Sequence, residues 1–159
     1  MNNVFLLLGS NLGDRKEYLQ QAIMHISYEI SPDIRISSVY ETESWGKTNE
    51  PDYLNMVIEL KTDMLAQTIL EHILNIEKIM GRVREEKWGS RIIDIDILYY
   101  NLDVINQPGL HVPHPQLHNR RFTLEPLAEL APNFVHPVLN KTNLQLKNEL
   151  RDSLIVKKL

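Results

Sequence analysis

The sequence has no cysteine among its 159 residues. This absence excludes a thiolate nucleophile, a disulfide framework and any metal site with cysteine ligands. A chain of this length can bury about 70% of the surface that its unfolded form exposes, so it needs neither disulfides nor zinc to fold. We therefore expect a single domain over residues 1–159 that is stabilised by its own hydrophobic core.

Glycine is also scarce, with six residues scattered along the chain. They nowhere form the G-x-x-x-x-G-K-[ST] or G-x-G-x-x-G patterns, whose backbone N–H groups surround phosphates. If the protein binds a nucleotide, side chains and metal ions must hold the phosphates instead.

An excess of positive charge is missing too, because 17 Lys and Arg residues face 21 Asp and Glu residues, for a net charge of -4. Non-specific nucleic-acid binding needs a basic surface, so we expect no nucleic-acid partner.

The apolar run Val4–Leu8 near the N-terminus is too short for a membrane span or a signal peptide. We expect a soluble cytoplasmic protein, a monomer or weak dimer, that acts on small molecules without a membrane.

Hydrophobic periodicity predicts alternating strands and helices over the first two thirds of the chain. Strands are expected at 3–9, 34–42, 53–60 and 92–100, and helices from Asp14 to Ile30 and from Asp63 to Gly81. This βαββαβ order predicts an α+β, ferredoxin-like fold with an antiparallel sheet and helices packed on it.

The remaining third of the chain has a different character. Val104 and Ile105 are expected to form a short partner for the strand at 92–100. A stretch rich in proline and histidine follows, then short helices at about 122–130 and 144–152. Residues 156–159 are expected to be a frayed end.

The strand at 92–100 contains two carboxylates at alternate positions, Asp94 and Asp96. Residues two apart on a strand share a face, about 6.5 Å from each other. Unpaired, these charges would repel by roughly 2.5 kcal/mol at an effective dielectric constant of 20. A cation must therefore lie there: either Mg²⁺, which prefers oxygen ligands, or an arginine in a structural salt bridge.

The residues before this strand favour the metal. Arg82, Arg84, Lys87 and Arg91 precede it within ten positions. Basic side chains beside paired carboxylates suit a metal–nucleotide site, with cations for the phosphates and carboxylates for the metal that bridges them. The alternative for such a charged run is ordinary solvated surface, against which Trp88 in its middle argues mildly.

A second group of residues suits a flat heterocycle. Tyr53 and Asn55 share the polar face of their strand, Trp45 precedes it, and Phe122 follows the histidine-rich stretch. Aromatic rings would stack on the heterocycle while the amide of Asn55 recognises its edge. Each aromatic residue alone is more often part of ordinary packing.

Two further features concern charge. Glu77 lies on the apolar stripe of the second helix, so its carboxylate should point inward and need a partner. Four histidines lie between 108 and 137, but prolines among them disfavour the helix that would gather them round zinc. We favour contact of His114 or Arg120 with phosphate.

The chain resembles the 6-hydroxymethyl-7,8-dihydropterin pyrophosphokinases of folate biosynthesis over nearly its whole length. The segments that carry this resemblance are GSNLGDR at 9–15, EPDYLN at 50–55, GRVR at 81–84, KWGSRIIDIDIL at 87–98 and VPHPQLHNRRF at 112–122. The combination of W-G-x-R with I-D-I-D is highly specific for this family.

The resemblance implies a fold, a reaction and a site. The fold is ferredoxin-like, and the β,γ-diphosphate of ATP passes to the hydroxymethyl oxygen of the pterin, releasing AMP. The residues at matching positions have the following implied roles: Asp94 and Asp96 bind two Mg²⁺ ions; Arg82 and Arg91 assist transfer; Thr42, Trp45, Tyr53, Asn55 and Phe122 bind the pterin; Glu77, Arg84, Trp88, His114 and Arg120 belong to the nucleotide site.

Four residues depart from those common in the family, namely Trp45, Ser90, Gly109 and His111. They bear on nucleotide affinity and loop dynamics rather than on the reaction.

Two other functions compete with pyrophosphoryl transfer. One is a Mg²⁺-dependent phosphohydrolase that uses the same aspartates, and the other is a non-catalytic ferredoxin-like module in which those aspartates are salt-bridged.

Overall fold

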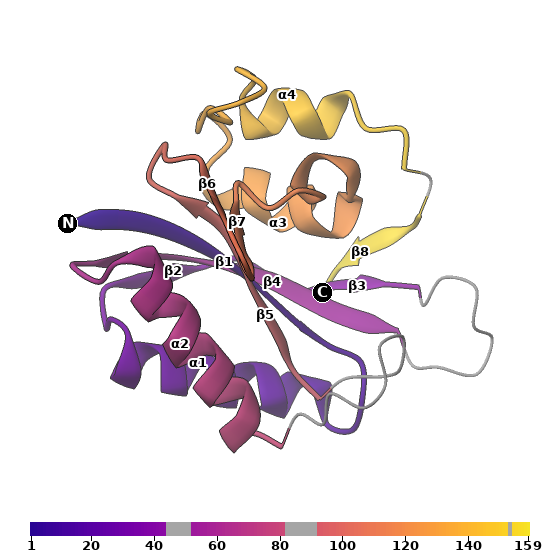
Figure 1. The fold of residues 1–159 in the computed structure, drawn as a ribbon. Coiled ribbons are helices and arrows are strands. Elements are labelled where there is room, and N and C mark those ends of the chain that lie inside the picture. The colour runs from indigo at the N-terminus through magenta and orange to yellow at the C-terminus, as the bar shows by residue number, and fades with distance from the viewer. Residues whose placement is uncertain (44–51, 82–91, 153) are drawn as a thin grey trace.

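The computed structural model describes residues 1–43, 52–81, 92–152 and 154–159. It is a mixed α/β fold built on an antiparallel sheet with the strand order β5-β1-β4-β3-β8, in which β2 also pairs with β4 (Figure 1). The strands are β1 (Asn2–Ser10), β2 (Ile34–Ile36), β3 (Tyr40–Thr42), β4 (Tyr53–Thr62), β5 (Asp94–Tyr100), β6 (Ile105–Gln107), β7 (Leu110–Val112) and β8 (Val156–Lys158). The helices are α1 (Arg15–Glu29), α2 (Ala66–Ile79), η1 (Leu117–Asn119), α3 (Arg121–Leu130) and α4 (Asn143–Asn148).

Helices α1 and α2 cover one face of the sheet, below it in Figure 1. Helix α1 begins after Asp14, whose carboxylate accepts a hydrogen bond from the backbone N–H of Glu17 at 3.3 Å, as predicted. The predicted start of α2 at Asp63 is wrong, because the helix begins at Ala66 and its first turn has no side-chain cap. The predicted end is confirmed, because Gly81 follows the helix with a φ of +93°.

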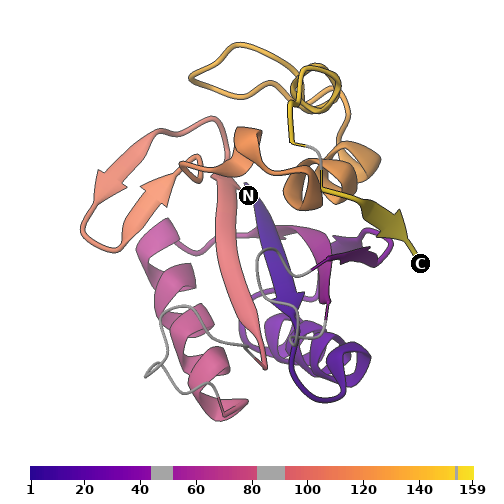
Figure 2. The same ribbon diagram turned by 90° about the vertical axis from the view of Figure 1, so that its right-hand side faces the viewer.

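Helices α3 and α4 cover part of the opposite face, and Figure 2 shows them on the other side of β1 and β4 from α1. Phe5, Leu7 and Val57 point to this side and pack with Leu127 in a second buried cluster. Because α3 and α4 extend over only part of this face, the end of the sheet near Gly9 remains outside that cluster.

Two predictions for the last third of the chain are wrong. Ile105 lies in a strand that pairs with β7 rather than with β5. The reason is that the Asn101 side chain accepts a hydrogen bond from the Asn3 N–H at 2.8 Å and Asn101 adopts a φ of +50°, so the chain turns away from the sheet. Residues 156–158 are not frayed but pair with β3, where Lys157 lies opposite Glu41.

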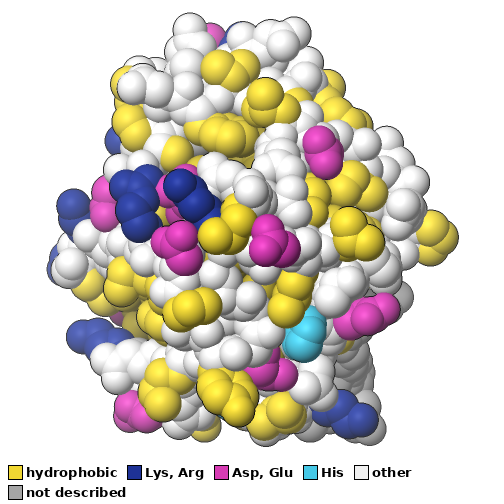
Figure 3. Space-filling view, turned by 90° about the vertical axis from the view of Figure 1, so that its left-hand side faces the viewer, with side chains coloured by type: hydrophobic (Ala, Val, Ile, Leu, Met, Phe, Trp, Pro, Cys, Tyr) yellow, Lys and Arg dark blue, Asp and Glu magenta, His cyan; other side chains and the backbone are white. Residues whose placement is uncertain are grey.

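No helix within residues 1–43, 52–81, 92–152 and 154–159 is long and apolar enough to cross a membrane. Figure 3 shows one face of the molecule, on which hydrophobic side chains alternate with charged and polar ones.

His136 stabilises a turn near the C-terminus in a way that depends on pH. The residue is 4% exposed, and its Nδ1 accepts hydrogen bonds from the N–H groups of Val138 and Leu139 at 3.2 and 3.1 Å. Burial, together with the nearby His118, lowers the pKa of His136. The unfolded chain therefore binds a proton at His136 more readily, so this stabilisation is present above the ordinary histidine pKa and decreases as pH falls through it.

We expect the urea midpoint of the protein to fall between pH 7 and pH 5 partly because of this residue. His136→Asn retains an acceptor for the turn but cannot titrate, so the pH-dependent decrease should be smaller in the variant. Denaturation curves of both proteins at several pH values measure the difference. An equal decrease in both proteins would show that His136 does not contribute.

Candidate functional site

A row of polar residues crosses the sheet at the end around Gly9, beyond the cluster that α3 and α4 cover. Thr42 in β3 lies opposite Tyr53 in β4, and Asn55 in β4 lies opposite Gly9 in β1. Gly9 in turn lies opposite Asp94 in β5. Directly opposed residues share a face, and neighbouring strands are about 4.8 Å apart, so Asn55 and Asp94 are separated by about 10 Å across Gly9.

Gly9 makes room for the side chain of Asn55. A Cβ atom at Gly9 would lie only 2.6 Å from Asn55 Nδ2. The same Nδ2 donates a hydrogen bond to the backbone carbonyl of Leu8 at 3.3 Å, and Asn55 is 5% exposed. The amide is thus fixed over β1, where it can recognise the edge of a ligand.

Thr42 has a feature that a core residue lacks. It is 3% exposed, and within the described part of the chain its hydroxyl has no hydrogen-bond partner. A buried hydroxyl without a partner costs stability, so it marks a position where a ligand can supply the missing bond. Half-buried Tyr53, directly opposite, presents a ring to the same space.

Asp94 and Asp96 point away from α1 and α2, because Ile95 and Ile97 between and after them belong to the core under those helices. Both aspartates are half-buried and both have further interactions. Their oxygen donors suit Mg²⁺, which usually takes one or two carboxylates and fills its shell with water and phosphate oxygens. No cluster of three or more potential metal ligands occurs among the described residues.

Glu77 points inward, as its position on the apolar stripe predicts, and it is only 2% exposed. Its Oε2 accepts a hydrogen bond from the backbone N–H of Ile95 at 3.0 Å. Glu77 therefore connects α2 to the stretch of β5 between the two aspartates, and it lies on the opposite face of the sheet from their side chains.

His114, Arg120 and Phe122 lie on the segment that leads into α3. The His114 N–H donates to the carbonyl of Leu98 in β5 at 3.0 Å, which holds this segment beside the strand of the two aspartates. The Arg120 guanidinium lies 5.5 Å from the centre of the Phe122 ring.

His114 carries its proton on a defined nitrogen. Its Nδ1 accepts a hydrogen bond from the Gln116 N–H at 3.1 Å, so the neutral ring has its hydrogen on Nε2. Burial lowers the pKa of His114, as does the charge of Arg120, and both outweigh the opposing effect of Asp94. The lowered pKa favours the neutral ring, so His114 can offer its Nε2–H to an anion.

Arg15 lies beside the candidate site but is not among the site residues predicted from the sequence. Its Nη1 donates to Glu41 Oε2 at 3.1 Å and to the backbone carbonyl of Asp52 at 2.6 Å. The first residue of α1 thus ties together β3 and the start of β4 beside Thr42 and Tyr53. The conspicuous GSNLGDR segment contains Arg15, but only the fold reveals its partners.

Five predicted site residues lie outside the described residues. They are Trp45, Arg82, Arg84, Trp88 and Arg91.

Paired carboxylates, a histidine N–H donor and an arginine near one end of a sheet are typical of phosphoryl-transfer enzymes. The model of the 7,8-dihydro-6-hydroxymethylpterin-pyrophosphokinase (HPPK) family matches residues 5–132. The chain belongs to this family, so it is a transferase of folate biosynthesis. The family match gives no support to the phosphohydrolase or to the non-catalytic module.

Curated relatives carry the same name. The chain is 44% identical to the 2-amino-4-hydroxy-6-hydroxymethyldihydropteridine pyrophosphokinase of Aquifex aeolicus over 94% of this chain and 92% of the relative. It is 42% identical to the enzyme of that name from Bacillus subtilis over 82% and 80% of the two chains.

A solved structure shares the fold. An HPPK-DHPS protein of Plasmodium falciparum has a TM-score of 0.75 and 20% identity, with 93% of this chain and 44% of that chain covered. At this identity the likeness concerns the fold alone.

Proposed function

We propose that the end of the sheet around Gly9 is the active site, with the dihydropterin on the β3–β4 side and ATP on the β5 side. The hydroxymethyl oxygen of the dihydropterin attacks the β-phosphorus of ATP and loses its proton. The bond from that phosphorus to the α,β-bridging oxygen breaks, and AMP leaves with the bonding electrons. The products are AMP and the pterin diphosphate.

In this proposal the pterin binds between β3, β4 and α3. Tyr53 and Phe122 stack on its two faces, while Asn55 and the segment from Thr42 to Trp45 recognise its edge. The fixed amide of Asn55 and the buried hydroxyl of Thr42 support this assignment. A site built to hydrogen-bond a ligand discriminates strongly against analogues that lack the matching groups.

The nucleotide binds on the β5 side. Asp94 and Asp96 would hold two Mg²⁺ ions, which supply charge neutralisation for the phosphates. His114 donates its Nε2–H, and Arg120 and Arg84 supply positive charge, to the phosphates. Trp88 belongs to the same nucleotide site, and Glu77 serves it from the other face of β5 through the N–H of Ile95. Arg82 and Arg91 stabilise the charge that develops during transfer. The separation of about 10 Å between Asn55 and Asp94 leaves room for the pterin and the β-phosphate to meet over Gly9.

The observation that carries this proposal is the alignment of Asn55, Gly9 and Asp94 on three adjacent strands. The test is to mix the protein with ATP, Mg²⁺ and 6-hydroxymethyl-7,8-dihydropterin and to follow both products by chromatography. We expect AMP and pterin diphosphate in equal amounts. Phosphate release without a pterin product would identify a hydrolase instead.

We also propose that the core is ferredoxin-like and that residues 1–159 form one domain. The strand order β5-β1-β4-β3 with α1 and α2 on one face supports the first point. The pairing of β8 with β3 supports the second, because it returns the last residues to the central sheet. We further propose that the enzyme is cytoplasmic and is a monomer or weak dimer.

A further inference from the structure

Strand β3 depends on other elements for its position. It has only three residues, which pair with β4 on one side and with β8 on the other. Tyr40 lies opposite Asn55, and Thr42 lies opposite Tyr53, so any shift of β3 moves the polar row of the site. A strand this short cannot fix its own place, and the contacts that hold it determine the geometry of the pterin side.

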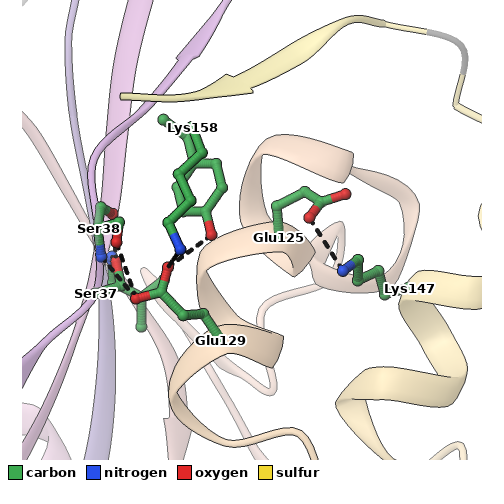
Figure 4. A network of polar contacts seen from close by, with 8 residues as sticks. Ser37, Ser38, Glu125, Glu129, Lys147 and Lys158 are labelled. Carbon is green, nitrogen blue, oxygen red and sulfur yellow. Dashed lines mark hydrogen bonds and ion pairs between the residues drawn. The ribbon is translucent and has the colours of Figure 1, made fainter.

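Besides these strand pairings, one carboxylate on α3 holds β3 and the residues just before it. Glu129 Oε2 accepts hydrogen bonds from the Ser38 N–H at 2.8 Å and from the Ser38 hydroxyl at 3.2 Å. Its Oε1 accepts a hydrogen bond from the Tyr40 hydroxyl at 2.6 Å. Figure 4 shows Glu129 reaching from α3 to Ser38, which lies in the segment between β2 and β3, with Lys158 of β8 also close to its carboxylate.

The hydrogen bonds from Ser38 and Tyr40 to Glu129 contribute more to the position of β3 than the ion pair between Glu129 and Lys158. Lys158 Nζ lies 3.7 Å from Glu129 Oε1 and its side chain is 59% exposed, so solvent screens this pair. Tyr40 by contrast is 6% exposed. Burial raises the pKa of Tyr40, and its hydrogen bond to Glu129 raises it further, so the phenol remains a donor. Burial alone would raise the pKa of Glu129, but the bonds from Tyr40 and Ser38 outweigh it and lower that pKa.

We propose that Glu129 is a positioning residue for the pterin: through Ser38 and Tyr40 it holds β3 where Thr42, Tyr53 and Asn55 face a common ligand. The inference rests on the proposed function. In this proposal Glu129 does not touch the reacting atoms. Strands β1 and β4 lie between β5, which carries the two aspartates, and β3, which Glu129 holds. Loss of its contacts should therefore affect pterin binding and leave the nucleotide side unchanged.

The chain offers a matched control on the same helix. Glu125 lies one turn before Glu129; it accepts a hydrogen bond from Arg121 at 3.3 Å and forms an ion pair with Lys147 at 3.2 Å. Figure 4 shows that the Glu125–Lys147 pair connects α3 to α4 and not to β3. Its replacement removes comparable charged contacts of α3 and leaves the bonds from Ser38 and Tyr40 to Glu129 in place.

For Glu129→Ala we expect the KM for 6-hydroxymethyl-7,8-dihydropterin to rise about tenfold, the size of one lost charged hydrogen bond, with little change in kcat or in the KM for ATP. Glu129→Gln, which retains an acceptor oxygen, should show a rise of only about threefold. Tyr40→Phe should resemble Glu129→Gln, and Glu125→Ala should leave all three constants within about twofold of wild type.

Steady-state kinetics, with unfolding midpoints for each variant, measure these values. Equal effects on the two KM values, or an equal rise in Glu125→Ala, would show that Glu129 acts on stability alone and would overturn the inference. If Glu129→Ala does not fold, Glu129→Gln and Tyr40→Phe decide the question. A wild-type protein that forms no pterin diphosphate would refute the proposed function, whereas an active wild type with unaffected variants would refute only the role of Glu129.

Discussion

Asp94→Asn and Asp96→Asn are each expected to reduce AMP formation by about a thousandfold or more, because a metal site worth several kcal/mol of transition-state stabilisation loses a charged ligand. The change is isosteric, and both side chains point away from the core beneath α1 and α2. Unfolding free energies should therefore remain within about 1 kcal/mol of wild type. Quenched-flow or steady-state assays of AMP, with urea denaturation alongside, measure the two quantities.

Asp103→Asn is a suitable control for this result. Asp103 is exposed in the turn that follows β5, so its replacement makes the same chemical change a few residues away from the site. We expect it to retain full activity. Turnover like that of wild type in either Asp94→Asn or Asp96→Asn would remove the metal assignment and leave a structural salt bridge as the explanation of the paired carboxylates.

The position of these carboxylates was predictable because it depends on local geometry. Alternation along a strand places Asp94 and Asp96 on one face whatever the rest of the fold does. The same holds for Glu77, since helical periodicity directs it inward. The partner of Glu77 was not predictable, because Glu77 lies on α2 and the N–H of Ile95 belongs to β5, 18 residues later in the chain.

The parts of the site that escaped prediction depend on contacts between distant segments. Glu129 meets Tyr40 across 89 residues, and Arg15 meets Asp52 across 37. The pairing of β8 with β3 joins the last residues of the chain to its first third. No local pattern specifies such partners, because register between distant strands is decided by the packing of the whole sheet.

Gly9 also depends on a contact with a distant residue, Asn55, and its replacement has the second large expected effect on activity. Gly9→Ala should raise the KM for the dihydropterin by about tenfold to a hundredfold, since a methyl group here would displace the amide that recognises the ligand. The new Cβ would lie 2.6 Å from Asn55 Nδ2 and 3.8 Å from Asn55 Cγ. Gly9 belongs to a regular strand, unlike Gly13, Gly81 and Gly109 with their positive φ angles, so the effect arises from this contact and not from backbone strain.

A double-mutant cycle with Asn55→Ala tests whether the effect passes through Asn55. Asn55→Ala alone should raise the KM for the dihydropterin to a similar extent. The double variant should be no worse than Asn55→Ala, because the side chain that the methyl group displaces is already absent. Additive effects of the two substitutions would mean that Gly9 contributes independently, for example by close approach of its backbone to the substrate. Strong non-additivity, with the KM for ATP unchanged throughout, would establish that Gly9 serves the pterin side by leaving space for the amide of Asn55.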